Sequence, residues 1–131
     1  MTMQADFRAL LTNDPALVAL VPVPAIVFGD FVQGRPYPCV TCDMASGATD
    51  VAHEGPTGLF QGRVQVDCYA NDYSQVRAIA DRVVTVLNGY RGGSFGGIFH
   101  RNEYGRREGA TNDADRPYRV ILDFEISWRK P

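Results

Sequence analysis

The strictest pattern in this chain is an apolar side chain at every second position near its C-terminus. The alternation runs from Val120 to Trp128, and polar side chains such as Asp123 and Glu125 occupy the positions between. A period of two places the apolar side chains on one face of a β-strand. A sheet with one apolar face must cover it, so the rest of the chain has to supply the cover. The apolar positions are Val120, Leu122, Phe124, Ile126 and Trp128.

A long amphipathic helix is the expected cover. From Tyr73 to Asn88, apolar side chains recur every three or four residues, the period of a helix that packs one face. Asn71-Asp72 is a turn and N-cap before it, and Asn88-Gly89 is a typical helix stop. The stripe consists of Val76, Ile79, Ala80, Val83 and Leu87.

A half-buried strand is predicted over Leu59–Ala70, directly before this helix. Its apolar and polar side chains alternate, so they lie on opposite faces. The apolar set is Val64, Val66 and Cys68, and the polar set is Arg63, Gln65 and Asp67.

Shorter elements are expected in the first third of the chain. Apolar spacing predicts a helix near the N-terminus, and Asp14-Pro15 is an N-cap followed by proline that starts a second helix ending near Leu20. Short strands are predicted over Ala25–Phe28 and Tyr37–Met44. The first helix has an apolar stripe of Met3, Phe7, Leu10 and Leu11.

Three segments are predicted as loops. Ala45–Gly58 has no period and several breakers, which indicates a loop or a flexible hairpin tip; Arg91–Gly97 is rich in glycine, and Arg107–Pro117 is polar. Ile98–Arg106 is a weaker strand. The sequence therefore predicts an α+β fold in one domain, residues 1–131. Its mostly antiparallel sheet would carry one long and one or two short helices on one face.

Charge and cysteine content narrow the possible functions. The chain has 131 residues and a formal net charge of -2, without the basic surface expected of a nucleic-acid-binding protein. Three cysteines form no disulfide framework, which is typical of a reducing compartment. Residues 1–7 carry Asp6 and no apolar signal core, and no stretch has the ~20 apolar residues of a membrane span. We therefore expect a protein made in the cytoplasm, with protein or small-molecule partners and no membrane contact.

Motifs for catalysis or cofactor binding are weak. Cys39 and Cys42 lie in a predicted strand, where this spacing sends them to opposite faces and argues against a shared metal or disulfide. His53 and His100 come from separate elements. The glycine-rich run 89–97 lacks the lysine and hydroxyl of a P-loop and follows a helix. No enzyme activity, cofactor or metal is therefore expected.

The carboxylates on the strand faces have two interpretations. Asp67, Asp123 and Glu125 are close enough for acid–base chemistry only if their strands are neighbours. Solvation, or pairing with arginines such as Arg63 and Arg119, is the more common arrangement.

An arginine cluster near residue 104 has the composition of a nucleic-acid patch. Glu103 and Glu108 interrupt it and cancel much of its field, which favours a solvated face or a protein contact. The cluster also leaves open the alternative of a weak contact with DNA phosphates. The cluster consists of Arg101, Arg106, Arg107 and Tyr104.

The order of these elements resembles that of small phage and prophage proteins known as tail completion or head–tail joining proteins. The central piece is a strand, Arg63-Val-Gln-Val-Asp-Cys-Tyr69, that leads into the helix of Tyr73–Leu87. The other matching pieces are Phe7-Arg-Ala-Leu-Leu11, Leu17-Val-Ala-Leu-Val21, Ala25-Ile-Val-Phe28, Arg35-Pro-Tyr-Pro-Cys-Val40 and the final strand Tyr118–Trp128.

This resemblance implies a structural role in a virion. Proteins of this family look like subunits of a ring, generally a hexamer, that stops tail-tube growth and docks on the head connector. The implied partners are further copies of the chain, the tail tube protein and the head connector or head-closure protein. Assembly would take place in the bacterial cytoplasm, and such a role needs neither a cofactor nor a catalytic residue.

Polar strand faces and the segment Ala45–Gly58 are the expected contact surfaces, because ring subunits meet through unlike surfaces. The candidate contacts are Asp50, His53, Glu54, Arg63, Gln65, Asp67, Arg101, Arg106, Arg107, Asp123 and Glu125.

Two alternatives stay open. The chain can be another neck or minor tail component of similar fold, such as a head-closure protein. It can also be a small dimeric α+β ligand-binding protein or enzyme with a pocket between sheet and helices. The candidate residues for that pocket are Asp67, Asp123, Glu125 and His100.

Overall fold

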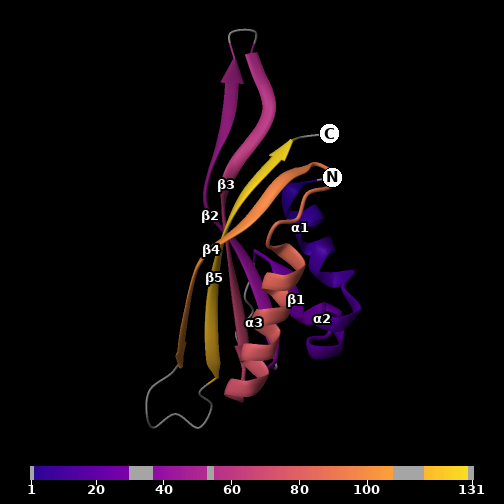
Figure 1. Cartoon of the computed structure of the whole chain (residues 1–131), viewed down its shortest axis with the longest axis vertical. Coiled ribbons are helices and arrows are strands. Elements are labelled where there is room, and N and C mark those ends of the chain that lie inside the picture. The colour runs from indigo at the N-terminus through magenta and orange to yellow at the C-terminus, as the bar shows by residue number, and fades with distance from the viewer. Residues whose placement is uncertain (1, 30–36, 53–54, 108–116, 130–131) are drawn as a thin grey trace.

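One mixed sheet with helices on a single face organises the molecule (Figure 1). The computed structural model describes residues 2–29, 37–52, 55–107 and 117–129, of which 46, 48–52, 55–58 and 106–107 are described by their backbone alone. Within these residues the strand order is β1-β2-β3-β5-β4. The helices are α1 (Met3–Thr12), α2 (Pro15–Leu20) and α3 (Tyr73–Leu87), with a short 3-10 helix η1 (Val23–Ala25). The strands are β1 (Ile26–Phe28), β2 (Cys39–Ala52), β3 (Gly55–Ala70), β4 (Phe95–Arg107) and β5 (Tyr118–Arg129).

Each α-helix begins at a short polar side chain that caps free backbone N–H groups. The Thr2 hydroxyl accepts from the N–H of Ala5 at 3.1 Å. The carboxylates of Asp14 and Asp72 cap α2 and α3 in the same way. The predicted caps at Asp14 and Asp72 are therefore confirmed, and α3 ends at Leu87 with Asn88 as its C-cap.

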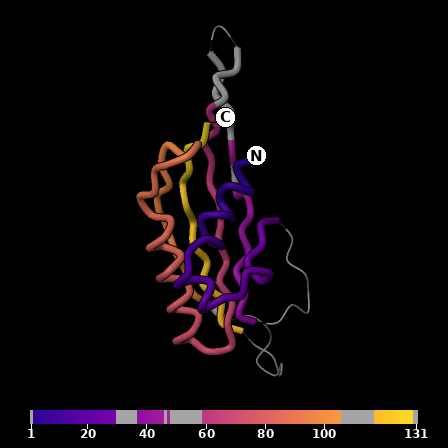
Figure 2. Tube along the Cα trace, turned by 90° about the vertical axis from the view of Figure 1, so that its right-hand side faces the viewer, coloured from indigo at the N-terminus to yellow at the C-terminus, as the bar shows by residue number. Residues whose placement is uncertain are grey.

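The core lies between the helices and the sheet; Figure 2 looks onto the helices, with the strands behind them. The apolar stripe predicted for α3 is fully buried, as are Phe7 and Leu11 of α1. Phe7 makes edge-on ring contacts with Phe28 of β1 and Phe95 of β4. The sheet contributes Val64, Val66, Cys68, Val120, Leu122, Phe124 and Ile126 to this core.

Sheet topology confirms the α+β prediction and adds one parallel pair. β2–β3, β3–β5 and β4–β5 are antiparallel, whereas β1 runs parallel to β2. The sheet is therefore mixed. The long connection between β1 and β2 makes this arrangement possible, because parallel neighbours cannot be joined by a tight hairpin.

Ala45–Gly58 was predicted as a loop or a flexible hairpin tip, and for the described residues the loop is wrong whereas the hairpin is confirmed. Residues 45–52 continue β2 and residues 55–58 begin β3, and the two strands pair from Ser46–Arg63 to Ala52–Gly55. The small side chains here show no alternation of apolar and polar residues that would predict a strand. Backbone hydrogen bonds between the two strands do not depend on such alternation. Residues 53 and 54, at the predicted tip, lie outside the described residues.

Two further boundaries differ from the predicted ones. The strand β4 begins at Phe95 instead of Ile98, so the loop over Arg91–Gly97 is shorter than expected. An irregularity between Phe95 and Gly97 lets this glycine-rich segment pair with β5. At its other end β4 includes Arg107, and residues 108–116 of the predicted loop lie outside the described residues.

Candidate assembly surfaces

The face of the sheet opposite the helices, called the open face below, carries most of the predicted contact residues. Strand alternation puts them there, because their neighbours along each strand point into the core. Arg63 of β3 stands across from Glu125 of β5, and Gln65 stands across from Asp123. The described polar side chains of this face include Arg63, Gln65, Asp67, Arg101, Arg119, Asp123 and Glu125.

Asp67 and Arg119 form a shielded ion pair on this face. The Arg119 guanidinium donates to Asp67 Oδ2 at 2.8 Å, and the side chains are only 17% and 12% exposed, respectively. The Gln65 amide also donates to the Asp67 carboxylate, at 3.0 Å. Arg119 further lies over the ring of Tyr69, 5.5 Å from its centroid. Removing one partner of so buried a pair leaves an uncompensated charge, which is strongly destabilising.

Two more exposed arginines flank a hollow on the open face. Arg63 reaches Asp123 at 3.5 Å, and Arg101 donates to Glu125 at 2.9 Å and lies over the ring of Phe99. The arginine side chains are 47% and 53% exposed. We call this feature the arginine hollow; its volume is about 520 Å³. It is lined by Gln61, Gly62, Arg63, Phe99, Arg101, Glu125, Ile126 and Ser127.

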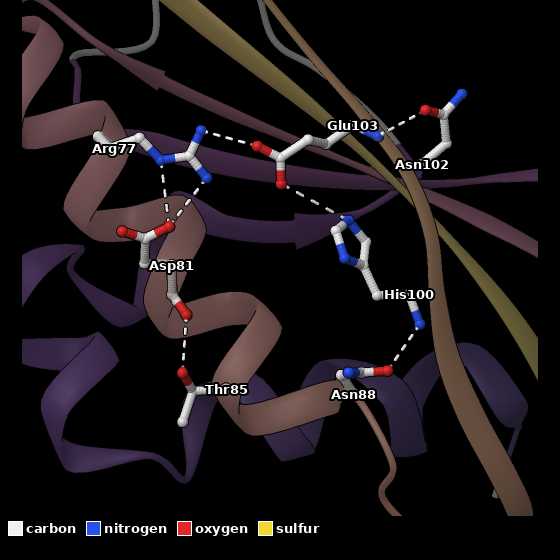
Figure 3. A network of polar contacts seen from close by, with 7 residues as sticks. All are labelled: Arg77, Asp81, Thr85, Asn88, His100, Asn102 and Glu103. Carbon is white, nitrogen blue, oxygen red and sulfur yellow. Dashed lines mark hydrogen bonds and ion pairs between the residues drawn. The ribbon is translucent and has the colours of Figure 1, made fainter.

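A second polar network joins α3 to the edge strand β4 (Figure 3). Arg77 bridges Asp81 on its own helix, at 2.9 Å, and Glu103 on β4, at 2.8 Å. His100 Nε2 lies 3.7 Å from the Glu103 carboxylate. The side chain of Asn88, after the helix, accepts from the backbone N–H of His100 at 2.9 Å. These contacts position β4, and hence Arg101 and Phe99, against the rest of the molecule.

The same region covers the outer backbone edge of β4. The Ile98 N–H donates to the Tyr90 carbonyl, and the Ile98 carbonyl accepts from the Gly89 N–H. Farther along, the Asn102 side chain accepts from the Glu103 N–H at 2.9 Å. On the opposite edge of the sheet, Arg8 donates to the Ile26 carbonyl of β1 at 2.7 Å. These contacts occupy part of each sheet edge and disfavour unspecific strand pairing there.

The eleven predicted contact residues divide into three groups. Six have described side chains on the open face: Arg63, Gln65, Asp67, Arg101, Asp123 and Glu125. Asp50 lies in β2, and Arg106 and Arg107 lie in β4, where the structure describes the backbone alone. His53 and Glu54 lie outside the described residues.

Acid–base chemistry required the strands of Asp67 and Asp123 to be neighbours, and they are. Both carboxylates, however, are bound by arginines. His100 packs against Phe124 on the helix-covered face, so it does not join them. Among the described residues no cluster of three metal-ligating side chains is present.

The cysteines are buried thiols. Cys39 and Cys42 stand across from different residues of β3, Tyr69 and Val66, in positions that face opposite sides of the sheet, as predicted. Burial raises the pKa of the Cys42 and Cys68 thiols, which disfavours the reactive thiolate.

The predicted role of Glu103 is wrong. It was expected to cancel the charge of the arginine cluster, but it turns to Arg77 on α3, and Glu125 is the partner of Arg101. A bulge between His100 and Asn102 explains the change, because an extra residue shifts the alternation of the strand. Sequence reasoning also missed Phe99 and Gln61 in the arginine hollow. The alternation of Leu59–Ala70 includes Gln61 on the polar face and is the signal that identifies it.

Comparison with known structures finds the same α+β fold in two solved chains. A chain from the virion of a native gene transfer agent particle matches with a TM-score of 0.75 and 19% identity, covering 98% of this chain and 95% of that one. A second solved chain matches with a TM-score of 0.53 and 14% identity, covering 99% of this chain and all of the other. None of the curated proteins matches.

The family model described as tail completion protein gp17 matches residues 5–128. The chain therefore belongs to this family and is a structural protein of the phage tail. Within the described residues, every helix is too short or too polar to cross a membrane.

Proposed function

We propose that this chain is a ring-forming subunit at the head-proximal end of the tail, where it ends tube growth and joins the tail to the head. The observation that carries the proposal is the match to the tail completion family over residues 5–128. The proposed partners are further copies of the chain, the tail tube protein and the head connector or head-closure protein, and the assembly needs no cofactor.

The open face supports this role because its side chains are already ordered. Ion pairs hold Asp67 with Arg119 and Glu125 with Arg101 at 2.8 and 2.9 Å. A partner that docks on side chains fixed in advance loses less conformational entropy than one that must order them. The open face is therefore suited to specific protein contacts, with Arg63, Gln65 and Asp123 as further contact residues.

A second, different surface is the far end of the β2–β3 hairpin, residues 50–52 and 55–58, called the arm below. It extends beyond the other strands (Figure 1), and the pairing of β3 with β5 ends at Leu59–Arg129. A ribbon of two strands is marginally stable in water, so the arm gains stability from a partner. A closed ring needs two unlike surfaces on each subunit, and the open face and the arm provide them. The proposed contact residues at the end of this hairpin are Asp50, His53 and Glu54. Arg101, Arg106 and Arg107 are candidates for weak contact with DNA.

Deletion of the gene from its phage tests the proposal. We expect heads and tails that fail to join, with overlong tails if the protein ends tube growth. Unjoined heads with tails of normal length would assign it to joining alone, as for another neck component. Normal infectious particles would contradict both roles. Electron micrographs of the lysate, with the gene restored from a plasmid as the control, distinguish these outcomes.

A further inference from the structure

His100 has a buried nitrogen atom without a hydrogen bond. On the helix-covered face of the sheet its imidazole packs against Phe124 of β5, with 5.3 Å between the ring centroids, and the side chain is 19% exposed. Within the part of the chain that the structure describes, its Nε2 is buried and has no hydrogen-bond partner. Buried polar atoms are normally hydrogen-bonded, so this exception calls for an explanation.

The carboxylate of Glu103 lies close to this nitrogen. Its Oε1 is 3.7 Å from His100 Nε2, which is too long for a hydrogen bond but within the distance of an ion pair. Its other oxygen, Oε2, accepts from Arg77 Nη1 of α3 at 2.8 Å. One carboxylate therefore faces a guanidinium on one side and an imidazole on the other (Figure 3).

The protonation state of the imidazole decides whether the contact with Glu103 is favourable. A neutral ring with its proton on Nδ1 turns a lone pair of Nε2 toward the carboxylate, so that two acceptors face each other. A protonated ring has an N–H on both nitrogens and offers the carboxylate a charged donor. Histidine side chains ordinarily change charge between about pH 5 and pH 8.

The groups around the ring favour this pairing. Arg77 is a cation that opposes protonation, but its charge is shared with Asp81 of its own helix, at 2.9 Å. Asn88, which binds the backbone N–H of the same residue, and Phe124 are uncharged. Glu103 is therefore the carboxylate that faces Nε2.

We propose that protonated His100 fixes the Glu103 carboxylate in the position where it binds Arg77, which makes the joint between β4 and α3 pH-dependent. At low pH the imidazolium and the guanidinium hold the carboxylate from both sides. As the pH rises, the neutral ring no longer holds it, and the joint loosens. Since β4 also contributes Phe99 and Arg101 to the arginine hollow, one wall of the hollow is held more firmly at low pH. This inference does not depend on the proposed ring.

A double-mutant cycle measured at two pH values tests the proposal. The four proteins are the wild type, His100→Gln, Glu103→Gln and the double variant, and chemical denaturation gives the equilibrium constant of unfolding of each. We expect the two side chains to be coupled by about threefold in this constant at about pH 5, and to be uncoupled at about pH 8. His53 is present in all four proteins, so its own titration cancels. Light scattering establishes that all four have the same mass at the concentration used.

The matched control is a second cycle with His100→Gln and Asp81→Asn. Asp81 binds the same guanidinium as Glu103, but among the described side chains no polar contact joins it to the imidazole. We expect no coupling in this cycle at either pH. Coupling that grows equally in both cycles at low pH would overturn the proposal, because it would reflect the charge of the whole region.

Two further outcomes would contradict the role of the proton. Coupling between His100 and Glu103 of equal size at both pH values would assign the contact to a neutral N–H on Nε2. Absence of coupling at both pH values would show that the 3.7 Å contact contributes nothing to stability.

Hydrogen exchange of the wild-type protein provides a readout that needs no variant. After correction for intrinsic exchange rates, the amides of β4 should be better protected at about pH 5 than at about pH 8. The amides of β1, at the opposite edge of the sheet, are the internal control. The same change in both strands would contradict a local effect of His100.

Discussion

Asp14 connects two helices through one carboxylate. It accepts the backbone N–H of Leu17 at 2.9 Å, which caps α2, and two hydrogen bonds from Arg82 of α3, at 2.7 and 2.8 Å. The hydrogen bond from Arg82 is the main cause that lowers the pKa of Asp14 below its usual 3.8. A carboxyl group with a lowered pKa in the folded state stabilises that state while ionised. Its contribution is full above the unfolded pKa and is lost as the pH falls through the folded pKa.

Arg82→Gln should therefore destabilise the protein in a pH-dependent way. We expect a lower unfolding temperature than wild type near neutral pH, and a difference that shrinks as the pH falls below the usual Asp14 pKa of 3.8. Thermal unfolding followed by circular dichroism at about pH 7 and about pH 2 measures this, with Arg91→Gln as the charge-matched control. A difference that stays constant over this range would show that Arg82 acts through packing rather than through Asp14.

Gly47 is constrained by a neighbour across the strand pair. A Cβ atom at this position would overlap Cζ of the Phe60 ring and would lie 3.1 Å from Cε of Met44. We expect Gly47→Ala to displace the Phe60 ring and to lower the free energy of unfolding by about 1 kcal/mol. Gly105→Ala is the control, because the nearest atom to its Cβ is 3.9 Å away. Chemical denaturation compares the two, and equal losses would contradict the steric argument.

These residues also mark what local sequence can reveal. The cap at Asp14 was predictable, because a cap and the following proline are adjacent in the chain. Its bond with Arg82 and the crowding of Gly47 by Phe60 were not, because each depends on residues brought together by the fold. The polar face of β3 was predictable from alternation, but the partner of each charge was not.

At the scale of elements, α3 and β4 act as one unit. The helix end contributes Asn88, Gly89 and Tyr90 to the outer edge of β4. Arg77 adds its 2.8 Å ion pair with Glu103. These contacts hold the strand that contributes Phe99 and Arg101 to the arginine hollow.

Asn88→Ala should loosen this joint at one backbone position. The N–H of His100 would lose its 2.9 Å bond to the Asn88 side chain. A hydrogen bond of this kind contributes about 1 kcal/mol, so hydrogen exchange at the His100 amide should accelerate about fivefold. The Ile98 amide is the internal control, because it donates to the Tyr90 carbonyl instead. Unchanged exchange at His100, or equal acceleration at both amides, would contradict a local role for Asn88.

Periodic elements were predicted well, and the others were not. Every residue of the apolar stripe predicted for α3 is buried, because apolar side chains recur every three or four residues in this segment. The strand over residues 45–52 was missed because its small side chains have no period and its pairing with β3 rests on backbone hydrogen bonds. The start of β4 was missed because glycines normally indicate a turn, whereas here they form an irregular strand end.

At the scale of the whole molecule, the two faces of the sheet have different roles. One face is sealed by the helices, and the other presents ordered ion pairs next to an arm that reaches past the sheet (Figure 1). The fold class followed from element order, but the parallel pairing of β1 with β2 did not, because nothing local specifies a neighbour across a long connection. The family resemblance was carried by the order of elements along nearly the whole chain, and the family match covers residues 5–128.

The most direct test of the proposed ring is the mass of the purified protein in solution. Light scattering over a wide concentration range, combined with negative-stain images of the same samples, measures both mass and shape. We predict closed rings, hexameric as the family resemblance implies, in equilibrium with smaller species as the protein is diluted. A protein that is monomeric at every concentration, or a tight dimer built around a pocket, would contradict this account.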